Sequence, residues 1–255
     1  MTERQFDVGD QPVVELRLGA GDVRVVEGAI GKVVVRLDGS DRALQTIDIG
    51  QQGDTVSVSS RKKFGFLSGV DVKVTVPPGT ELKAKLASAG LVVDVPLERL
   101  TVSVGAGDVK VGDVASDAEL HSASGDIRVG RIGGDAKVAV ASGDIRINEI
   151  LGDATIKSGS GDVEVAQAKG RCECKTASGD VVVKSFEGRS FQSTALAGDV
   201  VVGLPAGRTI DVSLQTLAGD VRNEFEVGGG EDEASGETSL DIKTMSGDIV
   251  LRSAS

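Results

Sequence analysis

The dipeptide Gly-Asp recurs in this chain at a fixed interval of 18 residues, and this repeat restricts the fold more than any other feature. The repeated dipeptides begin at Gly107, Gly125, Gly143, Gly161 and Gly179, and another follows at Gly198 after 19 residues. Gly134-Asp135 falls midway through one period and marks a half-period of nine. A fixed period indicates stacked structural units, so each nine-residue unit predicts one turn and one short strand.

Hydrophobic residues occupy every second position within these units, which predicts strands with one buried and one exposed face. Apolar columns also match at the 18-residue interval, and a hairpin meander would not require such matching. One half of the repeat gives the columns Ile127, Ile145, Val163 and Val181; Val129, Ile147, Val165 and Val183; and Ile132, Ile150, Ala168 and Phe186. The other half gives Ala118, Ala136, Ala154 and Cys172; and Leu120, Val138, Ile156 and Cys174. The pattern predicts a two-sheet parallel β-solenoid with 18-residue coils and two short strands per coil.

The chain is expected to be all-β and to form a single elongated domain over residues 1–255. The repeat solenoid is predicted over residues 87–255, and residues 240–252 are expected to close its end. Residues 1–86 also alternate, but they lack the 18-residue spacing. This region therefore predicts an irregular β cap, which a solenoid end requires.

Composition and charge make several classes of partner unfavourable. The net charge of −11 repels nucleic acid and anionic lipid. Aromatic residues make up 2% of the chain, and this scarcity argues against a carbohydrate site built from stacking rings. No apolar run is long enough to span a bilayer, and the first residues contain no apolar signal core, so a cytoplasmic protein is expected.

A four-residue motif, Ser-Gly-Asp followed by Ile or Val, carries a family resemblance. It occurs at Ser124–Ile127, Ser142–Ile145, Ser160–Val163, Ser178–Val181 and Ser246–Ile249. Together with Gly19–Val25 and Val74–Gly79, these motifs resemble the bacterial Toastrack family, whose members are also called candidate adhesins. The resemblance implies a β-solenoid-like domain that gene context often links to envelope-stress signalling, with no established enzymatic activity.

The repeated aspartates are predicted to stack into one ladder at an edge of the solenoid. They are Asp108, Asp126, Asp144, Asp162 and Asp180. One interpretation is that each carboxylate accepts backbone N–H groups in its own turn. The alternative is a row of calcium sites, since some nonapeptide β-helices bind calcium in their turns. Those repeats need more glycine than this one, so the calcium ladder is the weaker hypothesis.

The cysteines and the single histidine are predicted to be structural. Cys172 and Cys174 fall in two of the inward columns, so they are expected to be buried, reduced thiols. Neither a second cysteine pair nor a nearby histidine completes a zinc site. His121 falls in an outward column, so an exposed surface histidine is expected. No nucleophile, base and acid can be placed together, so the sequence predicts neither an enzyme nor a cofactor.

Two irregular segments are the remaining candidates for function. A basic and aromatic segment comprises Arg61, Lys62, Lys63, Phe64, Phe66 and Leu67. Such a tip can contact an acidic protein or an anionic membrane, although an ordinary turn is the simpler interpretation. Residues 228–237 are predicted to form an inserted acidic loop.

The sequence therefore predicts a non-enzymatic scaffold or interaction module with an unidentified protein partner and a peripheral membrane contact as a secondary hypothesis. Its place in an envelope-stress pathway follows from the family resemblance alone. Two alternatives stay open: a cation-binding or adhesin-like surface protein that uses the aspartate ladder, and a self-polymerising structural protein. The oligomeric state stays open as well.

Overall fold

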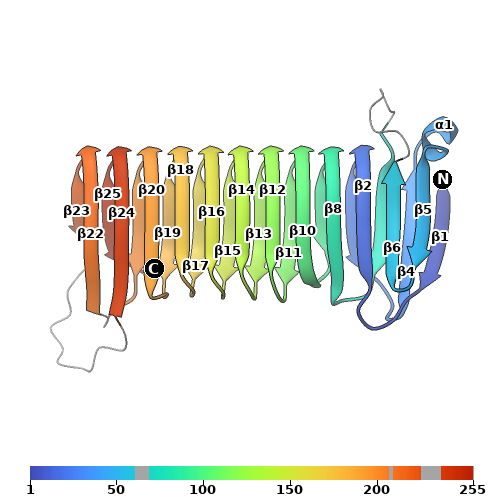
Figure 1. Ribbon diagram of the computed structural model, residues 1–255, viewed down its shortest axis with the longest axis horizontal. Coiled ribbons are helices and arrows are strands. Elements are labelled where there is room, and N and C mark those ends of the chain that lie inside the picture. The colour runs from blue at the N-terminus through green and yellow to red at the C-terminus, as the bar shows by residue number, and fades with distance from the viewer. Residues whose placement is uncertain (61–68, 207–208, 225–236, 255) are drawn as a thin grey trace. The chain divides into compact units, whose positions relative to one another are not determined.

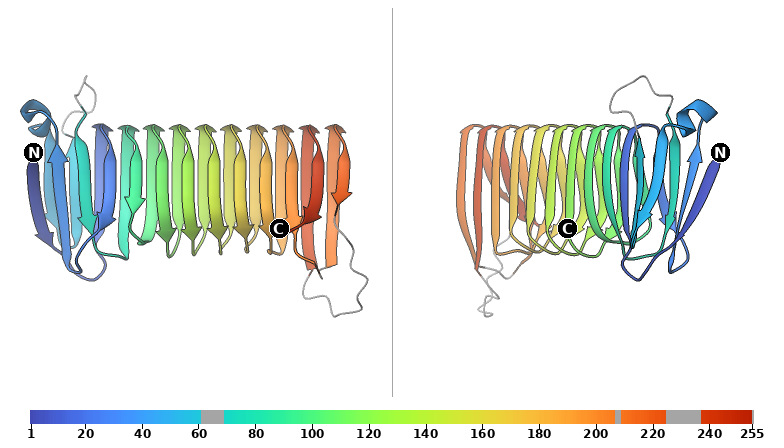
Figure 2. Two further views of the ribbon diagram at one scale, coloured as in Figure 1. Left: turned by 180° about the vertical axis from the view of Figure 1, so that it is seen from behind. Right: turned by 45° about the vertical axis from the view of Figure 1, so that its right-hand side comes forward.

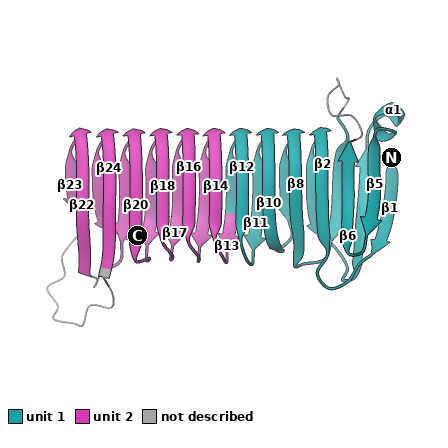
Figure 3. Cartoon of the chain, viewed as in Figure 1, with its two compact units in different colours: residues 1–129 teal, residues 130–255 magenta. Residues whose placement is uncertain are grey.

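The computed structural model describes residues 1–60, 69–206, 209–224 and 237–254. The chain forms two compact units, residues 1–129 and residues 130–255 (Figure 3). Both units are built from short strands in two-sheet coils, so the predicted all-β solenoid fold is confirmed. Among the described residues, no helix has the length and hydropathy needed to cross a bilayer.

Unit 1 contains a short helix and the first strands. They are β1 (Thr2–Asp7), β2 (Val13–Ala20), β3 (Val23–Glu27), β4 (Lys32–Asp38), α1 (Asp41–Leu44), β5 (Ile47–Gln52), β6 (Thr55–Ser60), β7 (Asp71–Val76), β8 (Thr80–Ser88), β9 (Leu91–Asp94), β10 (Leu97–Ala106), β11 (Val109–Val114) and β12 (Ala118–Ser124). Strand β13 (Ile127–Ile132) crosses the boundary between the units.

Unit 2 contains the remaining strands. They are β14 (Ala136–Ser142), β15 (Ile145–Ile150), β16 (Ala154–Ser160), β17 (Val163–Ala168), β18 (Cys172–Ser178), β19 (Val181–Phe186), β20 (Ser190–Ala197), β21 (Val200–Leu204), β22 (Thr209–Ala218), β23 (Val221–Glu224), β24 (Glu237–Ser246) and β25 (Ile249–Ser253).

The coils of unit 2 stack with the predicted 18-residue offset. Ala154 on β16 lies opposite Cys172 on β18, and Val163 on β17 lies opposite Val181 on β19, in both cases with parallel strands. The inward columns are buried, and Ile156 and Val165, for example, are fully inaccessible. Hydrophobic burial along these columns is the main force that holds the coils together.

Glycine makes the tight turn between the two strands of each coil. Gly161 has a φ of +121°, which side chains rarely tolerate. A Cβ atom added there would lie 2.3 Å from the carbonyl oxygen of Gly143, the equivalent residue one coil earlier. Close stacking of successive turns therefore requires glycine at this position of the repeat.

The last coil in sequence does not close the end of unit 2, contrary to the sequence-based expectation. β24 pairs in parallel with both β20 and β22, while β25 pairs with both β21 and β23. Figures 1 and 2 show this red coil between its two orange neighbours. It fits there because Leu240 and Ile242 supply the same buried columns as the other coils. The coil of β22 and β23 therefore lies at the end of unit 2.

Unit 1 combines parallel coils with an antiparallel cap. β2 pairs in parallel with β6 and β8, so the parallel coils begin inside the region that the sequence predicts as irregular (Figure 1). The cap is made by β5, β4 and β1, which pair antiparallel with β6, β7 and β4, respectively. Ser40 caps α1, because its Oγ accepts a hydrogen bond from the backbone N–H of Ala43 at 3.3 Å.

Candidate functional site

The predicted aspartate ladder exists, but its hydrogen bonds run between coils and not within each turn. The N–H of Asp162 donates to Oδ1 of Asp144 at 3.0 Å, and the N–H of Asp180 donates to Oδ1 of Asp162 at 2.9 Å. In unit 1, Asp126 and Asp108 are joined in the same way at 2.9 Å. The expectation that each carboxylate caps its own turn was therefore wrong for Asp108, Asp162 and Asp180, whose Oδ1 atoms accept a backbone N–H of the next coil.

The carboxylate oxygens of the ladder already have partners within the protein. Oδ1 accepts from the next coil, and on two of the aspartates Oδ2 pairs with arginine, at 2.7 Å for Arg128 with Asp126 and 2.9 Å for Arg146 with Asp144. Within the described ranges, no three His, Cys, Asp or Glu side chains lie close enough together to hold a metal ion. The ladder is thus built as a set of coil-to-coil hydrogen bonds.

Cys172 and Cys174 are buried thiols in the inward columns, as predicted. Their Sγ atoms lie 3.7 Å apart. The hydrogen bond with Cys172 and burial raise the pKa of Cys174 well above its ordinary value. A protonated thiol inside the core is a poor nucleophile and a poor metal ligand.

His121 lies on the outer face of β12, as predicted, with about half of its side chain exposed. Its Nε2 is 3.1 Å from Oε1 of Glu119, two residues earlier on the same face. An exposed pair on the outward face of a strand does not enclose a substrate.

Both irregular segments singled out in the sequence lie outside the described residues. The basic segment Arg61–Leu67 follows Ser60, which lies opposite Ile47 in the β5–β6 pair. The acidic segment 228–237 lies outside them too, except for Glu237, the first residue of β24.

The most unusual described surface is the coil of β22 and β23, which we call the open edge. Among the described strands, β22 and β23 each have a neighbour on one side only, namely β24 and β25. Val212 is 41% exposed and Val221 is 48% exposed, although both point inward. Their counterparts one coil away, Leu240 and Ile249, are almost completely buried. The open edge therefore presents core-type side chains to the solvent, and the outer side of β22 has no described neighbouring strand.

Three large apolar side chains extend this surface onto the outer face of unit 2. Leu196, Met245 and Leu217 lie on the neighbouring strands β20, β24 and β22, between pairs of residues that are in register. Each is more than half exposed. Neighbouring exposed apolar residues of this size commonly mark a contact surface.

Sequence periodicity did not reveal the open edge, but another signal could have. β22 carries a single charged residue, Asp211, in ten positions, whereas β24, the strand with which it pairs, carries three in ten. Edge strands are usually protected by charges, proline or bulges. The loss of charge along β22 was thus a sign that this strand does not behave as a protected edge.

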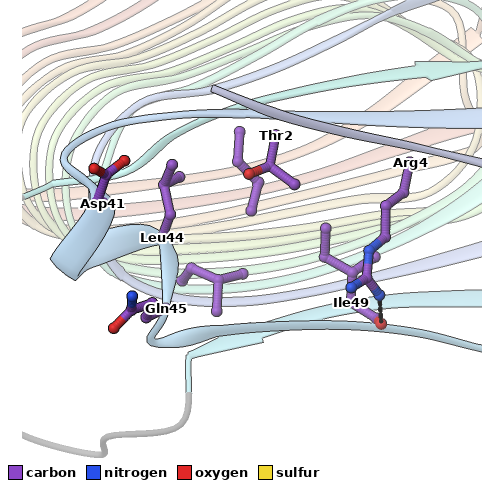
Figure 4. Close-up of a pocket in the computed structure, with 8 residues that line it drawn as sticks. Thr2, Arg4, Asp41, Leu44, Gln45 and Ile49 are labelled. Atoms are coloured by element: carbon purple, nitrogen blue, oxygen red, sulfur yellow. Dashed lines mark hydrogen bonds between the residues drawn. The ribbon is translucent and has the colours of Figure 1, made fainter.

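Unit 1 has a cavity of about 460 Å³ at its antiparallel cap (Figure 4). Thr2 and Arg4 of β1 lie on one side of it, and α1 lies on another. Nη1 of Arg4 donates a hydrogen bond to the carbonyl oxygen of Ile49 at 3.2 Å. Its other lining residues are Leu37, Asp41, Leu44, Gln45 and Ile47. Charged side chains on an edge strand hinder the addition of another strand, so Arg4 helps to protect the edge of β1.

Taken together, the stacked coils, the Gly-Asp turns and the antiparallel cap define a β-solenoid repeat protein. The model of the family described as Toastrack DUF4097 matches residues 13–252. The chain therefore belongs to the Toastrack family, and the resemblance seen in the sequence is confirmed. No curated protein matches the chain.

Solved structures with the same fold share little sequence with this chain. A candidate adhesin from Parabacteroides merdae has a TM-score of 0.55 at 12% identity, covering 98% of this chain and 95% of that chain. A candidate lipid binding protein from Parabacteroides distasonis has a TM-score of 0.50 at 14% identity, covering 98% and 96%, respectively. At this identity the comparison supports the fold alone.

Proposed function

We propose that this protein is a non-enzymatic interaction scaffold and that the open edge of unit 2 binds a protein partner. The observation that carries the proposal is the exposure of Val212, an inward side chain on a strand whose outer edge has no described neighbour. An added strand would pair with the free backbone groups of β22 and bury Val212, as in β-augmentation. Burial of apolar area and new backbone hydrogen bonds would then both favour binding.

The chemistry of the described side chains supports a role without catalysis. The single histidine is exposed beside Glu119, and both thiols are buried. A general base needs its nucleophile within hydrogen-bond reach and a site that excludes water. The outer faces of these coils instead carry exposed ion pairs, such as that of Lys175 and Glu173.

The cellular setting is a further part of the proposal. We place the protein in the bacterial cytoplasm, in envelope-stress signalling, because the family resemblance implies that pathway. The basic segment Arg61–Leu67 is proposed as a second contact, toward an acidic protein or an anionic membrane. Its three positive charges are concentrated in a chain whose net charge is −11.

Co-purification from the native host tests both contacts. Tagged wild-type protein is compared with Val212→Lys and with a deletion of residues 61–67, in soluble and membrane fractions. Ile30→Lys is the matched control, because Ile30 is an exposed apolar residue of unit 1, far along the chain from the open edge. We expect the partner to be lost with Val212→Lys, kept with Ile30→Lys, and lost from the membrane fraction with the deletion. A Val212→Lys protein that folds and keeps every partner would contradict the proposal.

A further inference from the structure

We propose that the partner of the open edge is a second copy of this chain, joined by antiparallel pairing of β22 with β22 of the other copy. This inference rests on the proposed function, because it uses the same edge as the contact surface. It adds the identity of the partner and the residue on the two-fold axis. A strand that pairs with its own copy makes a self-complementary interface, which is the commonest kind in protein dimers.

The side chains of β22 are compatible with such pairing when Ser213 lies on the two-fold axis. In that alignment Val212 of one copy faces Leu214 of the other. Both residues belong to the inward face, since they lie opposite the buried Leu240 and Ile242 of β24. The two copies would thus continue the inward columns across the interface and shield the exposed Val212.

Charge also permits the pairing at this strand. Asp211 is the only charged residue of β22, and in the proposed alignment it faces Gln215 of the second copy, not another carboxylate. Two chains with a net charge of −11 repel each other over most of their surfaces. They meet with the least repulsion along a strand that carries one charge in ten residues.

The charges of edge strand β1 in unit 1 disfavour the addition of another copy at that strand. Edge strand β1 carries Glu3, Arg4 and Asp7 in six residues. Arg4 points into the cap cavity, where its guanidinium is bonded to Ile49, and Glu3 pairs with Arg36 at 2.6 Å. These charges protect the edge against an added strand. Assembly through β22 alone closes at two copies.

A cysteine on the proposed axis gives a direct test. In Ser213→Cys, the new cysteine of one chain would lie directly opposite the same cysteine of the second chain. Directly opposed residues have Cβ atoms about 5 Å apart. Gln215→Cys is the control on the same strand and face. In the proposed alignment, position 215 of one chain lies four residues along the strand from position 215 of the second chain, a distance of about 13 Å. Cys172 and Cys174 are buried, so they do not compete for cross-linking.

Under mild oxidation we expect Ser213→Cys to form a disulfide-linked dimer and Gln215→Cys to stay largely uncross-linked. Sedimentation equilibrium should give wild type and Ile30→Lys twice the chain mass of 26.1 kDa, and Val212→Lys the mass of one chain. Wild-type protein that remains monomeric at high concentration overturns the dimer. If that monomer still captures a partner that Val212→Lys loses, the proposed function stands and only this inference fails. Cross-linking of Gln215→Cys in place of Ser213→Cys overturns the pairing.

Discussion

At the scale of single residues, the aspartate ladder explains how like charges can recur every 18 residues. Two carboxylates about 5 Å apart repel by about 1 kcal/mol in water-like surroundings. Asp162 offsets this repulsion because its carboxylate accepts the N–H of Asp180, and its own N–H donates to Asp144. Each aspartate therefore links two coils, and its removal should lower the free energy of unfolding.

Asp162→Ala is expected to lower the free energy of unfolding by about 1–2 kcal/mol, because the N–H of Asp180 loses a charged acceptor. Asp162→Asn should cost about half as much, since the amide oxygen still accepts. Urea denaturation at pH 7 measures both. Lys137→Ala, which removes an exposed outward side chain of β14, serves as the control and should stay within about 0.5 kcal/mol of wild type. Equal losses for Asp162→Ala and the control would refute this role.

At the scale of strands, ion pairs join coils across the outer face of unit 2. Glu149 lies between Lys169 and Arg131, at 2.9 Å from each. The hydrogen bond from Lys169, with the positive charges of both neighbours, holds the pKa of Glu149 below its ordinary value. A lowered pKa means that the native state keeps this carboxylate ionised at a pH where the unfolded chain already takes up a proton.

Ionised Glu149 should therefore contribute to the free energy of unfolding. This contribution is complete above the pKa of glutamate in the unfolded chain, about 4.3, and it disappears as the pH falls through the lower pKa of Glu149 in the native state. Because both ion pairs of Glu149 are partly open to solvent, we expect a contribution of about 0.5 kcal/mol. Urea unfolding at pH 7 and pH 3.5 should show a smaller acid-induced loss for Glu149→Gln than for wild type. The control variant Glu27→Gln, on β3 of unit 1, should lose as much unfolding free energy between pH 7 and pH 3.5 as wild type. Identical pH dependence in all three proteins would rule out this contribution.

The strands and their buried faces could be predicted from sequence because alternation and matched columns report directly on burial. Ile156 and Val165 are examples. The place of β24 could not be predicted, since its Leu240 and Ile242 fit between any two coils. Periodicity also shows which side chains point inward but not whether the next coil exists, so it missed the exposure of Val212. Helix α1, with four residues, is too short for helical periodicity to appear.

At the scale of the whole molecule, the two units differ in their strand edges. Unit 1 contains antiparallel strands with an arginine, Arg4, on edge strand β1, whereas unit 2 contains the open edge. Within each unit the aspartate ladder joins successive coils through backbone donors and not through ions. The stability of the molecule should accordingly be indifferent to calcium.

We expect the melting temperature to be the same with millimolar calcium and with a chelator, because the N–H of the next coil already occupies Oδ1 of residues such as Asp144. Differential scanning calorimetry under both conditions makes the comparison. Since a ligand that binds the native state raises the melting temperature by mass action, a calcium-dependent increase would revive the cation-binding alternative. The Asp162→Asn variant should then lose part of that increase.

The insertion of β24 and β25 between two earlier coils has a consequence for biosynthesis. Residues 209–224 leave the ribosome before residues 237–253, which form their described neighbours β24 and β25 in the folded protein. The coil of β20 and β21 likewise receives β24 and β25 as neighbours only then. The native form of the open edge is therefore complete only after translation has passed its own sequence.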